Sequence, residues 1–192
     1  PTHPSFQDSI NKAILALIKA TEGRALVLFT SNQALKIAKE YVKDKIGDDI
    51  AIYAQGDDER FKLLQLFKND IKSSLFATMS FWEGIDVRGD ALSLVIIDKL
   101  PFTAPDDPLL KARIEDCRLQ GGDPFHEIQL SDAVITLKQG VGRLIRDVTD
   151  RGAIIICDNR LVMRPYGATF LKSLPNAGRT RDLQKVIQFL QN

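Results

Sequence analysis

Five short apolar segments recur along the chain, and each is bounded by polar residues. Runs of four to eight apolar residues that contain many β-branched side chains are typical of strands buried on both faces. We therefore predict five β-strands, within RALVLFTS (24–31), DIAIYAQG (49–56), SSLFATMS (73–80), ALSLVIIDKL (91–100) and GAIIICDNR (152–160).

Amphipathic segments separate these runs. Apolar residues recur at helical spacing in 5–23, 32–47, 57–70 and the tail 180–192, so a helix is expected in each. Gly23 is expected to end the first helix, Ser31 or Asn32 to cap the second, and acidic side chains to lie in the first turn of the third. Buried strands alternating with such helices predict an α/β fold, a doubly wound parallel sheet flanked by helices.

The segment from Pro101 to Leu130 breaks this alternation because it contains four prolines. We predict an insertion at about 101–130, made of loop and helix and crossing the carboxyl end of the sheet. The chain shows no internal repeat, so the whole of 1–192 is interpreted as one domain. The opening PTHPSFQDS lacks a Met and is expected to lie inside a longer protein.

Composition narrows the function classes. The chain is 44% hydrophobic and 27% charged, and no apolar run approaches the roughly 18 residues that span a bilayer. Cys117 and Cys157 form no C-x-x-C pair, which argues against zinc or iron–sulfur ligation within this chain and predicts two free thiols. His126 stands without a metal-ligating or triad pattern, so it receives no role.

Charge is unevenly distributed. Residues 1–137 carry 16 Lys and Arg against 21 Asp and Glu, whereas 138–192 carry 10 against 4. A polyanion is therefore expected to face the C-terminal third, although a solvated surface has the same pattern.

The stretch LKQGVGRLIRD (137–147) has two glycines and two arginines within a helical pattern. Each interior glycine costs a helix about 1 kcal/mol relative to alanine, so something other than helix stability favours them. Gln139, Arg143 and Arg146 are spaced to lie on one helical face, and Gly140 and Gly142 leave neighbouring positions bare. An amide and two planar guanidinium groups suit a polyphosphate, whereas the alternative is a solvated basic helix.

Several motifs together resemble one family. QGVGRLIR resembles motif VI of superfamily 2 helicases, Q-x-x-G-R-x-x-R. SFWEGIDVRGD (80–90), VLFTSN (27–32) and DKLPFTAPDDPLLKAR (98–113) resemble motif V, motif IV and the segment after motif V of the XPD/DinG-like branch. The ending LVMRPYGATFLKSLP (161–175) is similar to the bacterial DinG/YoaA group. The resemblance implies the second RecA-like domain of an ATP-dependent DNA helicase that acts in repair or replication.

The resemblance also implies site residues. Arg146 is favoured as the arginine finger at the transferring phosphoryl group, with Arg143 beside it and Gln139 as a polar partner. Further nucleotide contacts fall on Gly142 and on the motif V residues Glu83, Gly84 and Asp86. An alternative for the two acids is that they only brace a turn.

Contacts to single-stranded DNA are expected at six residues, and five of them have an alternative. Ser31 and Asn32 equally suit the cap of a helix, and Trp82 equally suits the core. Arg160 and Arg164 equally suit an ion pair or a contact to the neighbouring domain. A hydroxyl, an amide and a helix N-terminus bind phosphate without reading sequence, whereas an exposed aromatic side chain stacks on bases. The six residues are Ser31, Asn32, Ser80, Trp82, Arg160 and Arg164.

Two motifs of a complete ATPase are absent from the sequence, G-x-x-x-x-G-K-[ST] and D-E-A-H. The resemblance implies that an upstream RecA-like domain supplies the phosphate loop, shares ATP and Mg²⁺, and carries a 4Fe–4S cluster. We expect this chain alone to be inactive as an ATPase. The protein is expected to be cytoplasmic and associated with the bacterial nucleoid. The resemblance also implies a clamp-loader accessory subunit of the DNA polymerase as a partner. The alternative is a non-catalytic RecA-like module that docks a replication or repair partner.

Overall fold

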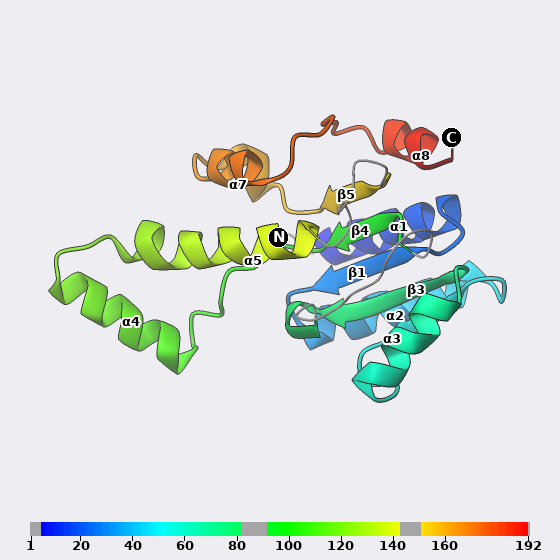
Figure 1. Cartoon of the computed structure of the whole chain (residues 1–192), viewed down its shortest axis with the longest axis horizontal. Coiled ribbons are helices and arrows are strands. Elements are labelled where there is room, and N and C mark those ends of the chain that lie inside the picture. Colours follow the sequence, from blue (N-terminus) through cyan, green and yellow to red (C-terminus); the bar gives the residue numbers. More distant parts are fainter. Residues whose placement is uncertain (1–4, 82–91, 143–150, 192) are drawn as a thin grey trace.

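A computed structural model describes residues 5–81, 92–142 and 151–191, and its centre is one parallel sheet (Figure 1). The strand order is β2-β3-β1-β4-β5, and all neighbouring strands are parallel. The five predicted strands are confirmed, each shorter than the segment in which it was predicted: β1 (Ala25–Phe29), β2 (Ala51–Ala54), β3 (Ser73–Thr78), β4 (Leu94–Ile97) and β5 (Ala153–Ile156).

The central strand explains why these runs lack polar alternation. All five residues of β1 are buried. Leu26 and Leu28 join one hydrophobic cluster, while Val27 and Phe29 join another on the opposite face. Successive side chains of a strand point to opposite faces, so a sheet covered on both sides needs apolar residues at every position.

Helices cover the two faces of the sheet. Their residues show that α1 (Phe6–Ala20), α2 (Asn32–Ile46) and α8 (Leu183–Gln191) pack on one face, and α3 (Arg60–Asn69), α5 (Ser131–Val141) and α7 (Gly167–Ser173) on the other. This is the predicted doubly wound α/β arrangement, and it is confirmed.

Two predicted helix ends are wrong. Helix α1 ends at Ala20 and is capped by Thr21, whose hydroxyl donates to the Leu17 carbonyl over 3.0 Å. Gly23 lies beyond the cap with φ +94°, where an added Cβ would be 2.6 Å from the Ser73 nitrogen. Helix α3 begins at Arg60, so the acidic residues 57–59 precede its first turn instead of lying in it.

The proline-rich segment, residues 101–130, forms a projection that is called here the arm. After β4 the chain continues into α4 (Pro108–Leu119), where Asp107 caps the helix by accepting from the Leu110 N–H over 2.7 Å. A π-helix, η3 (Phe125–Leu130), then runs directly into α5. Figure 1 shows α4 and the beginning of the η3–α5 helix projecting beyond the sheet on the side where β1 and β4 end, whereas the end of α5 lies over the sheet.

Short helices complete the chain. The 3₁₀ turn η1 (Met79–Phe81) follows β3, and α6 (Arg160–Met163) follows β5. The predicted tail helix is confirmed as α8, whereas α6 and α7 were not predicted. Among the residues described, none of the helices is long and apolar enough to cross a membrane.

Candidate functional site at the carboxyl end of the sheet

Three sequence motifs follow strands of the sheet. Thr30–Asn32 follows β1, Ser80 and Phe81 follow β3, and 158–160 follows β5. Because the strands are parallel, these segments meet at one end of the sheet, which is where open α/β folds bind ligands. This end, called here the carboxyl end, is the candidate site.

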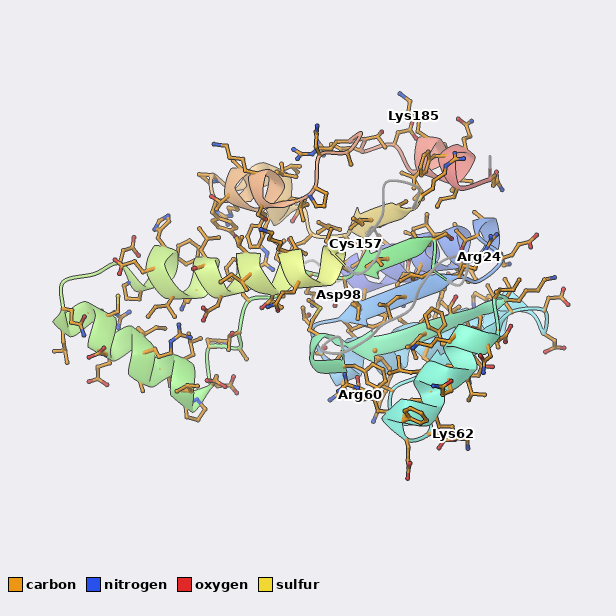
Figure 2. All side chains as sticks on the ribbon, in the orientation of Figure 1. Arg24, Arg60, Lys62, Asp98, Cys157 and Lys185 are labelled. Atoms are coloured by element: carbon orange, nitrogen blue, oxygen red, sulfur yellow. The ribbon has the colours of Figure 1, made fainter. Side chains whose placement is uncertain are left out.

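A buried carboxylate joins β1 to β4 at this end (Figure 2). Asp98 comes directly after β4 and is 1% exposed. Its Oδ1 accepts from the Thr30 N–H over 2.9 Å and its Oδ2 accepts from the Thr30 hydroxyl over 3.3 Å. Asp98 is not among the residues predicted from the sequence, although a lone acidic residue directly after a buried strand is a detectable signal. Asp98 holds the start of the Thr30–Asn32 segment in place.

Burial changes the proton affinity of Asp98. Desolvation raises the pKa of its carboxyl to about 6, against the opposing effect of the hydrogen bonds from Thr30 and the charge of Lys99. The same setting affects Cys157, where burial first, and then the charges of Asp98 and Asp158, raise the pKa of the thiol to about 12. This thiol is therefore protonated at neutral pH.

Asp98→Asn should remove one source of pH dependence. The folded state binds a proton at Asp98 near pH 6, whereas the unfolded chain binds it near the ordinary aspartate pKa of 3.8. The folded state therefore gains about 1.3 kcal/mol of stability from this residue as pH falls from about 7 to about 5. Asparagine keeps an acceptor for Thr30 and lacks the titration.

Urea denaturation at both pH values measures the effect. The stability of the wild type relative to Asp98→Asn should increase by about 1 kcal/mol at the lower pH, since other titrating groups are common to both proteins. An equal response of both proteins to pH would contradict the assignment.

A second carboxylate joins β4 to β5. The Asp158 side chain is fully buried, and its Oδ2 accepts from the Leu100 N–H over 2.9 Å. Arg160 donates to the same carboxylate from Nε, at 3.0 Å to each oxygen, and from a terminal nitrogen at 2.6 Å. Burial alone would raise the pKa of Asp158, but the bonds from Arg160 and Leu100 outweigh it and hold the pKa below its ordinary value. Arg160 thus forms the salt bridge that was the alternative to a DNA contact. Arg164 is exposed.

Two further contacts organise the region around β3. The Gln55 side-chain carbonyl accepts from both the N–H and the hydroxyl of Thr78, each over 2.8 Å, and joins β2 to β3. Arg60 donates to the Phe81 carbonyl over 3.1 Å and lies 5.1 Å from the centroid of its ring. Arg60 thus fixes the chain where the predicted motif V begins. Gln55, Thr78 and Arg60 are not among the site residues predicted from the sequence.

The predicted DNA contacts after β1 lie on the surface. Ser31 caps α2, with its hydroxyl accepting from the Ala34 N–H over 3.2 Å, and Asn32 is the first helical residue. Both side chains are exposed at the N-terminus of α2. The capping alternative is confirmed for Ser31, and it is compatible with a phosphate contact because a helix N-terminus favours anions.

The predicted phosphate face is described only in part. Gln139 and Gly142 are exposed at the C-terminal end of α5, and Gly140 is buried there. The exposed amide suits a polar group approaching from outside. Ser80 lies in η1. The other predicted site residues lie outside the described ones: Trp82, Glu83, Gly84, Asp86, Arg143 and Arg146.

The remaining candidates for chemistry are the two cysteines and His126. Both cysteines are free of disulfide bonds and half-buried. His126, which received no role, is exposed and has its Nδ1 2.6 Å from the Asp123 carboxylate. Within 5–81, 92–142 and 151–191, no group of three or more His, Cys, Asp or Glu is arranged to hold a metal ion.

Comparison with known proteins identifies the family. The family described as helicase C-terminal domain matches residues 14–177, most of the chain. The chain belongs to the helicase C-terminal domain family. Together with the relatives described next, this match confirms the resemblance to the XPD/DinG-like helicases.

Individual members of the helicase C-terminal domain family agree with this result. The chain is 66% identical over 185 residues to "ATP-dependent DNA helicase YoaA" of Haemophilus influenzae, covering 96% of the chain and 29% of that protein. It is 42% identical over 173 residues to "ATP-dependent helicase DinG" of Mycobacterium tuberculosis, covering 90% of the chain and 26% of that protein. The chain thus spans less than a third of the length of these relatives.

A solved structure shares the fold. The structure titled "XPD_Helicase" superposes with a TM-score of 0.62 at 22% identity, over 86% of this chain and 31% of that one. At this identity the likeness concerns the fold alone, and it supports the RecA-like α/β architecture.

Proposed function

We propose that the chain is the second motor domain of an ATP-dependent DNA helicase that acts in DNA repair or replication. The observation that carries this proposal is the 66% identity, over 96% of the chain, to a protein named as an ATP-dependent DNA helicase. The position of the three motif segments at one end of the sheet supports it, since these segments carry proposed DNA contacts and a motor domain must present such contacts together.

The proposed ATP site is shared between two domains. Gln139, Arg143 and Arg146 approach the phosphates from this chain, together with Gly142 and the motif V residues Glu83, Gly84 and Asp86. ATP supplies the phosphoryl group, and the arginines stabilise the charge that develops as it is transferred. The phosphate loop, the Mg²⁺ ligands and a 4Fe–4S cluster belong to the upstream domain. This chain by itself then hydrolyses ATP negligibly.

The proposed DNA contacts are Ser31, Asn32, Ser80, Trp82, Arg160 and Arg164. Most of them offer hydrogen bonds or charge to phosphate, which suits a motor that moves along DNA of any sequence. Affinity for single-stranded DNA should therefore fall as salt rises.

Hydrolysis of ATP by the full-length protein, with and without single-stranded DNA, tests the function. We expect DNA to stimulate turnover, and a tailed duplex to be separated only when ATP is hydrolysed. No stimulation and no strand separation would reject the motor and favour the second candidate. In that candidate, the arm or the basic tail with Arg179 and Arg181 docks a partner such as a clamp-loader accessory subunit.

Ser31→Gly should separate helix capping from DNA binding. Glycine at an N-cap costs only a few tenths of a kcal/mol, so the stability of the fold should change little. Loss of the hydroxyl removes one hydrogen bond to phosphate, which predicts a 2- to 10-fold weaker affinity for single-stranded DNA.

Fluorescence anisotropy with the full-length protein measures this affinity. Ser31→Thr keeps both the cap and the hydroxyl, so it should bind DNA as the wild type does. Equal affinities of Ser31→Gly and the wild type would show that Ser31 only caps α2.

A further inference from the structure

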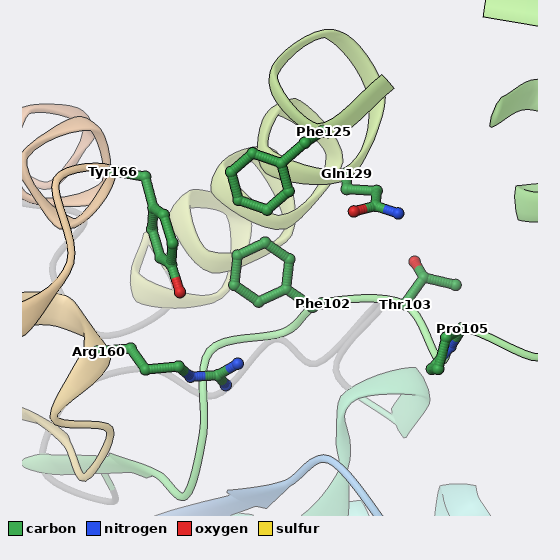
Figure 3. A pocket seen from close by; sticks show the side chains of 7 residues that line it. All are labelled: Phe102, Thr103, Pro105, Phe125, Gln129, Arg160 and Tyr166. Carbon is green, nitrogen blue, oxygen red and sulfur yellow. The ribbon is translucent and has the colours of Figure 1, made fainter. Parts of the chain in front are cut away.

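A small pocket lies between the arm and the chain that follows β5 (Figure 3). Its cavity volume is about 180 Å³. Sites that enclose a drug-sized ligand have roughly 300–1,000 Å³, so this pocket is suited to one planar ring system, single or fused, and not to a whole nucleotide. Its lining comes from the loop after β4, from η3 and from the segment after β5: Phe102, Thr103, Pro105, Phe125, Gln129, Arg160 and Tyr166.

Aromatic rings form one side of this pocket. The Phe102 and Phe125 rings are inclined by only 21°, with centroids 6.1 Å apart. Tyr166 meets both, with its ring centroid 5.8 Å from Phe102 and 5.4 Å from Phe125. All three side chains are half-buried, so they stay partly open to solvent. A half-open group of three rings is a stacking surface of the kind on which nucleobases bind in single strands.

Polar groups surround the rings on the remaining sides. Figure 3 shows the Arg160 guanidinium on one side of Phe102, and Gln129 and Thr103 on another. The guanidinium carbon is 5.4 Å from the centroid of the Phe102 ring. An amide, a hydroxyl and a guanidinium offer both donors and acceptors to the edge of a heterocycle.

The pairing of Arg160 with Asp158 indicates that the pocket takes an uncharged group. Two nitrogens of this guanidinium donate to the Asp158 carboxylate, with Nε shared between both oxygens, so the pair is close to neutral as a whole. A phosphate gains less from a paired guanidinium than from a free one, whereas a base can still stack and accept hydrogen bonds. The exposed Arg164 lies four residues further along the chain and remains available to a phosphate of a DNA strand whose base occupies the pocket.

We propose that this pocket holds one nucleobase of the bound single-stranded DNA, stacked on the surface formed by Phe102, Phe125 and Tyr166. The inference rests on the proposed helicase function and deepens it. Ser31 and its neighbours bind the phosphate backbone, and the pocket holds a base. Because every base has a π-face, the contact tolerates any sequence.

Binding of the full-length protein to two probes tests the inference. The probes are oligothymidylate and an abasic oligomer of the same length, measured by fluorescence anisotropy at one salt concentration. The wild type should prefer the probe with bases. Phe125→Leu, and separately Tyr166→Leu, should reduce this preference by about tenfold, since stacking on an aromatic side chain strengthens binding by about 5- to 150-fold per base.

A matched control lies elsewhere on the fold. Phe61 on α3 is a phenylalanine with 72% exposure outside the pocket, so Phe61→Leu should leave the preference for bases unchanged. Thermal unfolding of each variant accompanies the binding assay. A side chain that only packs would change the melting temperature and leave the ratio of the two affinities as it is.

The outcomes are distinct. An unchanged preference in both pocket variants, with DNA binding intact, overturns the pocket and leaves the helicase function standing. If the wild type binds neither probe, the proposed function itself is rejected. An increased KM for ATP in Phe125→Leu, without a change in the preference, would assign the pocket to a free nucleotide and overturn the DNA assignment.

Discussion

Replacing Arg146 by alanine should lower the DNA-stimulated turnover of ATP by the full-length protein about 10³-fold or more. Arg146 is the proposed arginine finger, and a finger stabilises charge that appears only as the phosphoryl group is transferred. The loss should therefore fall on kcat, with little change in the KM for ATP or in DNA affinity. Steady-state hydrolysis over a range of ATP concentrations measures both constants.

Two variants control for charge and for folding. Arg146→Lys keeps a positive charge but lacks the planar guanidinium fork, so it should remain strongly impaired. Arg151→Ala removes an exposed arginine whose guanidinium donates to the Phe189 carbonyl, away from the proposed site, and should leave turnover unchanged. Wild-type turnover in Arg146→Ala would contradict the arginine-finger role and would favour a structural role for the glycines and arginines of segment 137–147.

Asp158→Ala should destabilise the fold by about 3 kcal/mol. The carboxylate is fully buried, whereas the Arg160 side chain is 31% exposed. Removing one member of a buried ion pair costs about 3–5 kcal/mol, because the remaining charge loses its partner away from water. The lower end applies here, since Arg160 reaches solvent, although the Leu100 N–H also loses its acceptor.

Urea denaturation measures this loss, and two comparisons separate its causes. Asp158→Asn keeps an acceptor for Leu100 and should be affected less than Asp158→Ala. Adding Arg160→Met to Asp158→Ala removes the unpaired charge and should restore part of the stability. A loss below about 0.5 kcal/mol in Asp158→Ala would place it with ordinary surface substitutions and contradict the structural role.

The sheet could be predicted because its evidence is local. Each strand is a short apolar run, and burial on both faces keeps polar residues out of it, as β1 shows. The cap at Ser31 was likewise a local signal. Helix ends were less predictable, because Glu59 and Arg60 both suit the start of a helix. Helices α6 and α7 were not predicted, because they are short and Pro165 interrupts the helical pattern between them.

The site could be predicted only where a motif was continuous in sequence. Ser31 and Arg160 stand at the expected end of the sheet because each follows a predicted strand. Asp98 and Thr30 are 68 residues apart, and Gln55 and Thr78 are 23 apart, so each pair exists only once the strands are neighbours. The pocket at Phe102 likewise depends on how the arm folds back toward the chain after β5.

The two buried carboxylates have a consequence for local opening. The amide hydrogens of Thr30 and Leu100 lie just outside β1 and β4, where loop amides usually exchange quickly with solvent. Each is instead bonded to a carboxylate that belongs to a neighbouring strand end. Exchange at either amide requires those strand ends to separate, so these two amides should be protected nearly as well as the sheet behind them.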